Sequence, residues 1–254
     1  MLEISIIKCL TDNYSYLIKD NNTDLIGIVD PSDFETVDNQ IRTKYKKLDF
    51  ILNTHHHQDH IGGNAELKKK YNSKIVASKI DEDKIPNIDY KVVEGDIFKF
   101  GDTKFKILFI PGHTKGHIAF YSKLEKTVFT GDTLFSLGCG RIFEGTYNQM
   151  YNSLNKLKKL PSDTKIFCGH EYTKKNIEFC MKYDFNNKYL VNKLNWINLQ
   201  LQSKKPTLPT TLAEEIKMNI FLRCNIPSLK KDLKMEKASD EEIFKKLRDL
   251  KDQF

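Results

Sequence analysis

Cysteine is scarce in this sequence, and the cysteines that occur are not grouped. There are five among 254 residues, an odd number with no CxxC pair, at Cys9, Cys139, Cys168, Cys180 and Cys224. This usage indicates neither a disulfide framework nor a zinc ribbon. A reducing, cytoplasmic setting fits it best.

Long apolar runs are also missing. No stretch approaches the roughly 18 apolar residues that a membrane-spanning helix needs. The first residues include Glu3 and only a short apolar run, which argues against a signal peptide. We therefore expect no membrane partner.

Neither sign of charge dominates strongly. Lysine and arginine number 41 and aspartate and glutamate 34, so the formal net charge is +7. The excess is spread along the chain, with short clusters such as Lys68–Lys70. Such an excess permits a nucleic-acid-binding surface, but a generally lysine-rich composition is the simpler interpretation. We expect no nucleic-acid partner.

The first 173 residues read as short, β-branched apolar runs separated by turns, with helical patterns between them. Strands are predicted at Asp24–Val29, Phe50–Leu52, Lys74–Ala77, Lys104–Ile110, Thr127–Thr130 and Lys165–Cys168, and helices at Asn64–Tyr71 and Tyr147–Leu157. Many strands with helices between them predict packed α/β layers.

From about Lys174 the pattern becomes helical. One helix is predicted over Lys188–Gln202, and two others begin at the capping-box patterns Thr211–Glu214 and Ser239–Glu242. These run towards Arg223 and to about Lys251. We therefore divide the chain into an α/β domain over residues 1–173 and a small all-helical domain over residues 174–254.

The seven histidines lie in three short stretches, each of which follows an apolar run. The stretches hold His55, His56, His57 and His60, then His113 and His117, then His170. Loops at strand ends are where a rigid sheet presents ligands to one point, and imidazole is the commonest metal ligand among side chains. The sequence therefore predicts a metal site.

The spacing around the first stretch favours two ions side by side. His55 and His57 alternate around His56, so in extended backbone they point the same way. Asp59 and His60 are adjacent and point elsewhere, so one ion cannot readily use all four. Asp132, at another strand end, offers a carboxylate that can bridge two ions. We expect His56 and His117 to be structural rather than ligands.

These residues resemble the metallo-β-lactamase superfamily, whose signature is the His-x-His-x-Asp-His run. They are most similar to the glyoxalase II family, the hydroxyacylglutathione hydrolases. The branch is indicated by four segments, Asp132–Phe135, Gly138–Gly140, Gly169–Thr173 and Lys251–Phe254. The resemblance implies a four-layer αββα sandwich with a small C-terminal helical domain.

The resemblance also implies a set of metal ligands. It assigns His55, His57 and His113 to one ion and Asp59, His60 and His170 to another, with Asp132 as the bridge. Asp30 would orient a ligand histidine, the usual role of a carboxylate behind a metal-bound imidazole. Two divalent ions are implied. Zinc is the first choice, but iron and manganese also accept such ligands.

Glutathione recognition in the family maps by the same resemblance onto Arg141, Phe143, Tyr172, Arg248 and Lys251. Arg141 replaces a lysine and keeps the cation, whereas Phe143 replaces a tyrosine and loses a hydroxyl donor. Three cations suit glutathione, which carries two carboxylates.

The implied reaction is hydrolysis of S-(2-hydroxyacyl)glutathione thioesters, typically the lactoyl ester, in the detoxification of methylglyoxal. A hydroxide shared by the two ions would attack the thioester, and Asp59 would steer it. Three alternatives stay open. They are a persulfide dioxygenase of the same fold with one iron, a lactamase-fold nuclease, and a scaffold with a structural metal.

Overall fold

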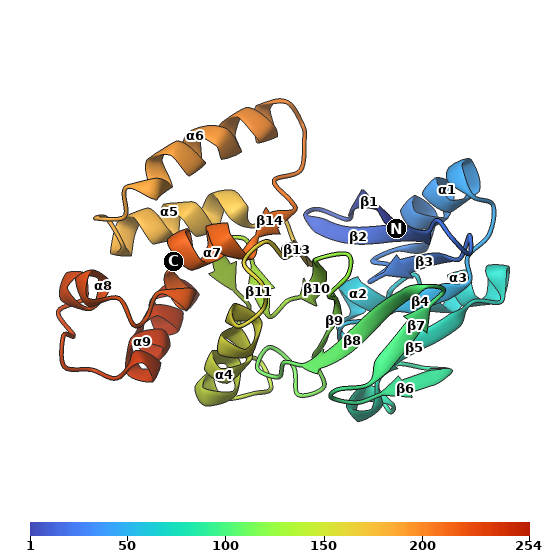
Figure 1. Cartoon of the computed structure of the whole chain (residues 1–254), viewed down its shortest axis with the longest axis horizontal. Helices are drawn as coiled ribbons and strands as arrows, with labels where there is room; N and C mark the ends of the chain where they lie inside the picture. Colours follow the sequence, from blue (N-terminus) through green and yellow to red (C-terminus); the bar gives the residue numbers. More distant parts are fainter.

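Two six-stranded sheets form the middle of the molecule, as the computed structural model of residues 1–254 shows (Figure 1). The first sheet runs in the order β1 (Leu2–Cys9), β2 (Asn13–Asp20), β3 (Ile26–Val29), β4 (Phe50–Leu52), β5 (Lys74–Ser78) and β6 (Tyr90–Val92). The second runs β14 (Thr210–Thr211), β13 (Lys165–Cys168), β10 (Thr127–Gly131), β9 (Ile118–Ser122), β8 (Thr103–Phe109) and β7 (Ile97–Phe100). A separate hairpin consists of β11 (Leu134–Phe135) and β12 (Gly138–Cys139).

Each sheet is mixed. In the first, β1, β2 and β3 pair antiparallel, and β3 to β6 pair parallel. In the second, β7 to β10 pair antiparallel, β10 and β13 pair parallel, and β14 lies antiparallel on the outer edge of β13. The parallel strands deliver their carboxyl ends to one edge of each sheet.

Alternation along the strands divides the core into layers, because successive side chains of a strand point to opposite faces. Val29, Leu52 and Val76 of the first sheet meet Phe120 and Phe129 of the second in one buried cluster between the sheets. The alternate residues of the first sheet pack on the helices α1 (Phe34–Lys44) and α3 (Asn64–Tyr71).

The other face of the second sheet packs on α4 (Tyr147–Lys158) and on the tail, in a cluster of 27 buried residues. Helix, sheet, sheet and helix follow one another, which confirms the four-layer αββα sandwich with a helical C-terminal region. Short helices α2 (Gln58–Ile61) and η1 (Lys79–Asp81) lie in the loops that follow β4 and β5.

The tail holds α5 (Thr173–Tyr183), α6 (Tyr189–Gln202), α7 (Leu212–Met218), η2 (Ile220–Leu222), α8 (Pro227–Asp232) and α9 (Asp240–Asp252). Both expected capping boxes form, at Thr211 and Ser239. The helix from Thr211 stops at Met218 rather than near Arg223, because the Asn219 side chain caps a new 3-10 turn through the Phe221 amide. The tail also contributes the strand β14, which the sequence did not predict.

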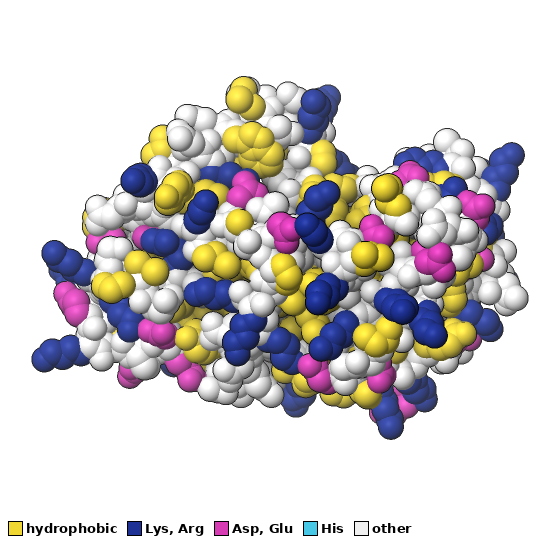
Figure 2. Space-filling model, viewed as in Figure 1, with side chains coloured by type: hydrophobic (Ala, Val, Ile, Leu, Met, Phe, Trp, Pro, Cys, Tyr) yellow, Lys and Arg dark blue, Asp and Glu magenta, His cyan; other side chains and the backbone are white.

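Lysine and arginine side chains are scattered over the face of the molecule seen in Figure 2, and acidic and apolar side chains lie between them. None of the helices is long and apolar enough to cross a membrane.

A buried carboxyl group joins the tail to the β11–β12 hairpin. Glu215 is fully buried and accepts hydrogen bonds from the Leu137 amide at 2.8 Å, the Thr210 hydroxyl at 2.8 Å and the Asn219 amide at 2.9 Å. Burial raises the pKa of Glu215 to about 7, although the three donors oppose the shift. The carboxyl group therefore holds a proton more tightly in the folded chain than in the unfolded chain.

This shift predicts a pH-dependent stability. Because the folded chain binds the Glu215 proton more tightly, the free energy of unfolding should fall as the pH rises from about 4.5 to about 7, by at most about 3 kcal/mol. The Glu215→Gln substitution keeps the side-chain size and an acceptor oxygen for Leu137 and Asn219 but does not titrate, so it should flatten this slope in urea unfolding. Glu178→Gln, on the exposed side of α5, is the matched control. An unchanged slope for Glu215→Gln would contradict the argument.

Candidate metal centre

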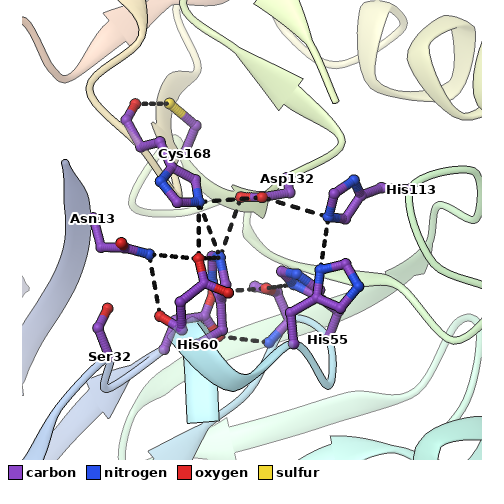
Figure 3. A network of polar contacts seen from close by, with 12 residues as sticks. Asn13, Ser32, His55, His60, His113, Asp132 and Cys168 are labelled. Atoms are coloured by element: carbon purple, nitrogen blue, oxygen red, sulfur yellow. Dashed lines mark hydrogen bonds and ion pairs between the residues drawn. The ribbon is translucent and has the colours of Figure 1, made fainter. Parts of the chain in front are cut away.

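The candidate ligands stand on loops that follow four strands. His55, His57 and Asp59 follow β4, His113 follows β8, Asp132 follows β10, and His170 follows β13. Figure 3 shows His55, His60, His113 and Asp132 pointing toward one another from different parts of the chain. The segment Thr54–His60, here called the histidine loop, is fixed at its start. Asp30 accepts hydrogen bonds there from the Thr54 amide at 2.8 Å and the Thr54 hydroxyl at 2.6 Å.

Close packing around the site requires glycine at two positions. Gly131 has a φ of +46°, and a Cβ there would lie 2.3 Å from the Thr54 hydroxyl oxygen. A Cβ on Gly169 would lie 2.2 Å from Asp132 Oδ1. Each glycine therefore lets a strand end approach the other ligands.

The donor atoms form two groups. The first group consists of His55, His57 and His113, and the second group of Asp59, His60 and His170. Within each group the donor atoms lie within 4.8 Å of one another. We call the place where each group could hold an ion the first and the second position. A third set of this spacing adds Asp30 to His55 and His60. Both oxygens of Asp30 already accept hydrogen bonds from Thr54. Asp30 is therefore better suited to orient His60, 3.0 Å away, than to bind a metal ion itself.

Asp132 lies between the two groups. Its Oδ2 is 3.5 Å from His113 Nε2 and 3.3 Å from His170 Nε2, and its Oδ1 is 3.4 Å from His60 Nε2. Asp132 Oδ1 and His55 Nε2 are buried and have no hydrogen-bond partner. Such orphaned atoms are rare in folded proteins. They fit a bound cation, so the residues present suit a metal.

In four of the five candidate ligand histidines, Nδ1 lies within hydrogen-bond distance of an oxygen atom. His60 Nδ1 lies 3.0 Å from Asp30 and His170 Nδ1 lies 2.9 Å from Asp12. His113 Nδ1 lies 2.7 Å from the Arg141 carbonyl oxygen, and His55 Nδ1 lies 3.0 Å from the Thr54 hydroxyl. These contacts fix the rings so that the other nitrogen faces the site.

Sequence reasoning missed Asp12 and gave no role to its neighbour Asn13, whose Nδ2 donates to Asp59 at 2.9 Å. The only sequence feature that could have pointed to Asp12 is the polar run Thr11–Asn13 between two apolar segments. Nothing in the sequence spacing connects that run to His170.

The electrostatics of the two groups differ. Burial lowers the pKa of His57 to about 4, and His113 adds to the shift. In the other group burial also opposes the charged form, but the nearby carboxylates, Asp132 first among them, together raise the pKa of His60 to about 10 and that of His170 to about 11. The second group therefore lies in the more negative field.

His56 and His117 lie outside both groups. His56 Nδ1 is 3.1 Å from Asp81 and its Nε2 is 3.4 Å from Glu144, so the ring points away from the other histidines. His117 stacks on His55 and accepts a hydrogen bond from the Asp132 amide at 3.0 Å. Neither residue belongs to a group of donor atoms that could hold an ion.

A cavity of about 630 Å³ opens over the donor atoms. Its wall is formed by His57, Asp59, His113, Asp132 and His170 together with Phe135, Arg141, Phe143, Glu144 and Tyr172. The Tyr172 ring stacks on His170 at 4.7 Å, and the Phe143 ring meets His57 and His113 edge-on. A small ligand in this cavity would reach the metal donors and the Arg141 cation at once.

The region of the fold that carries these donors matches a known family model. The model described as the metallo-beta-lactamase superfamily matches residues 10–170. The chain belongs to this superfamily. A second model, described as the hydroxyacylglutathione hydrolase C-terminus, matches residues 171–254.

Relatives of this superfamily member match it over its whole length. The hydroxyacylglutathione hydrolase of Pelagibacter ubique is 51% identical over 253 residues, covering 100% of each chain. That of Rhodopseudomonas palustris is 41% identical over 249 residues, covering 98% of each chain. The resemblance to glyoxalase II is thereby confirmed. Among solved structures, ETHE1 from Myxococcus xanthus aligns with a TM-score of 0.70 at 25% identity, over 98% of this chain and 91% of that one.

Arg248 and Lys251 of α9 are not part of the cavity wall. Arg248 is 4% exposed, and its guanidinium donates to the Cys139 carbonyl at 2.8 Å and pairs with Asp252 at 3.0 Å. Lys251 donates to the Lys175 carbonyl at 3.3 Å. Arg248 therefore lies behind the segment that leads to Arg141. Direct contact between these two residues and a ligand stays a prediction.

Removing Asp132 should damage metal binding more than any other single ligand change, because Asp132 faces both groups. We expect Asp132→Ala to lose most of the bound metal, measured as metal per chain by elemental analysis. His56→Ala is the control, since that ring contacts Asp81 and Glu144 and neither donor group. Equal metal loss in the two variants would show that the ligand assignment is wrong.

Proposed function

We propose that the protein hydrolyses S-(2-hydroxyacyl)glutathione thioesters, typically S-lactoylglutathione, to glutathione and a 2-hydroxy acid. The observation that carries the proposal is a complete double set of metal donors in a chain that matches hydroxyacylglutathione hydrolases from end to end. A one-iron dioxygenase would not need both groups. The five free, buried cysteines support a cytoplasmic location.

The proposed site holds two divalent ions, with zinc as the first choice. His55, His57 and His113 would hold one, Asp59, His60 and His170 the other, and Asp132 both. Bound there, such ions polarise a carbonyl oxygen and lower the pKa of water towards neutrality. Asp30 would keep His60 in place as a ligand.

Asp59 is the residue best placed to orient the attacking water. Its side chain is 40% exposed and forms part of the cavity wall. Burial opposes its ionisation, but the contacts with His170 and His60 lower its pKa well below the usual range. Asn13 holds its Oδ2 from the other side. An ionised Asp59 can accept a hydrogen bond from water and aim the oxygen at the thioester carbon.

The leaving group needs little help from the protein. An ordinary thiol has a pKa of about 8.5, so a thiolate can depart at neutral pH without a strong general acid. This agrees with the cavity wall, which carries no serine or cysteine nucleophile.

We propose that Arg141 and Tyr172 contact the glutathione part of the substrate directly. Arg141 is exposed on the cavity wall and can bind a carboxylate through two parallel hydrogen bonds. Arg248 and Lys251 would complete the binding region from α9. Lys251 offers its ammonium group, while Arg248 fixes the Cys139–Gly140 backbone ahead of Arg141. Phe143 would supply an apolar surface, without the hydroxyl of the tyrosine that it replaces.

An assay on S-lactoylglutathione tests the proposal directly. Protein purified without chelator should release free thiol from this substrate and carry about two metal ions per chain, and chelation should abolish the activity until metal is restored. Full activity with one ion per chain would exclude the two-ion site. Two bound ions without hydrolysis would exclude the substrate.

The α9 cations should affect binding rather than chemistry, because they lie away from the metal donors. Lys251→Ala should raise KM by about tenfold to a hundredfold with little change in kcat, and Arg248→Ala should raise KM as well, because it frees the Cys139–Gly140 backbone ahead of Arg141. Burial lowers the pKa of Lys251 to about 8, and the nearby positive charge of Arg248 adds to this shift. Because Lys251 loses its charge above this pH, kcat/KM should fall as the pH rises above about 8.

The Lys251→Arg variant is the control for this pH effect, since arginine stays charged and should abolish the fall. If both alanine variants instead lose kcat at constant KM, α9 does not bind the substrate.

A further inference from the structure

We infer that Asp12 is a positioning residue that strengthens the second metal position alone, by holding His170. The inference rests on the two-ion site proposed above. Asp12 belongs to the three-residue turn Leu10–Asp12, which joins β1 to β2 where Cys9 pairs with Asn13.

The backbone fixes this turn against the segment that carries His170. The Asp12 carbonyl accepts from the Glu171 amide at 2.8 Å, and the Tyr14 amide donates to the Gly169 carbonyl at 2.7 Å. Asn13 and His170 form a β-bridge between these two bonds. The Asp12 carboxylate is thus aimed at the ring by main-chain contacts on both sides of it.

The carboxylate selects which ring nitrogen faces the site. Asp12 Oδ1 lies 2.9 Å from His170 Nδ1, so a proton on Nδ1 is held there as a hydrogen bond. The opposite nitrogen, Nε2, then presents its lone pair 3.3 Å from Asp132 and 3.4 Å from Asp59. A carboxylate behind an imidazole also makes that imidazole a better metal ligand.

In the first group no histidine has a carboxylate hydrogen-bonded to its Nδ1. Two of its three rings are oriented by neutral acceptors, the Thr54 hydroxyl at His55 and the Arg141 carbonyl at His113. In the second group both histidines have carboxylates behind them, Asp30 at His60 and Asp12 at His170. The effect of Asp12 should therefore be confined to the second position.

Asp12 can be changed without disturbing the core. Asp30 is buried and also holds Thr54, so its loss would disturb the whole histidine loop. The Asp12 side chain is 38% exposed, and its hydrogen-bond partner is His170. Of the two carboxylates behind the histidines of the second group, Asp12 is therefore the one that can be removed by itself.

The test measures Zn²⁺ affinity by competition with a chromophoric chelator in two single-position backgrounds. His57→Ala removes a ligand of the first position, and His170→Ala removes a ligand of the second. Adding Asp12→Ala should weaken Zn²⁺ binding about tenfold to a hundredfold in the His57→Ala chain. In the His170→Ala chain it should change the affinity by less than about twofold, since its partner ring is gone.

Asp12→Asn keeps an acceptor for Nδ1 but loses the charge, so its effect should fall between the parent and Asp12→Ala. Asp24→Asn, in the next turn of the same sheet, is the matched control and should change nothing. In the otherwise unaltered chain, Asp12→Ala should weaken one of two Zn²⁺ binding steps. Equal effects in both backgrounds, or two unchanged steps, would overturn the inference. A parent chain that binds a single ion would instead refute the two-ion proposal.

Discussion

One buried carboxylate, that of Asp30 at the end of β3, sets the position of the whole site. It accepts hydrogen bonds from the amide and hydroxyl of Thr54 and lies 3.0 Å from His60 Nδ1. The start of the histidine loop and one of its last ligands are therefore tied to the same two oxygens. With these contacts the loop offers His55, His57, Asp59 and His60 in fixed directions. Asp132 and His170 arrive from the second sheet, so the site depends on both sheets packing in register.

The packing of the two sheets explains why the donors meet. Large rings from both sheets fill the space between them, and Tyr16, Phe129 and Phe167 contact one another there. A shift of one sheet against the other would separate Asp132 from the histidine loop. Close packing of this kind resists such a shift, because any displacement opens voids or forces overlaps. The rigidity of the metal centre is thus a property of the apolar core beneath it.

The sequence was informative where chemistry is local. Seven donors at strand ends, two capping boxes and the apolar alternation of the strands are each visible within a few residues. Contacts between distant parts of the chain were not visible. Asp12 meets His170 across 158 positions and Arg248 meets Cys139 across 109, and no periodicity relates such partners. Glu215 looked like an ordinary first-turn glutamate, because only the folded tail shows that it is buried against Leu137. The strand β14 was missed because two threonines before a helix read as a cap, and Thr211 serves as both.

The place of β14 has a consequence for any shortened form of this protein. Thr210 and Thr211 pair with Ile166 and Lys165, and the chain turns into α7 directly afterwards. A chain ending near residue 173 would leave one side of β13 without partners, next to the loop that carries His170. An open strand edge is a template on which other chains can add, and natural proteins commonly blunt such edges with very short strands. The tail thus protects the edge of β13 against self-association, and a truncated protein would expose a surface prone to aggregation.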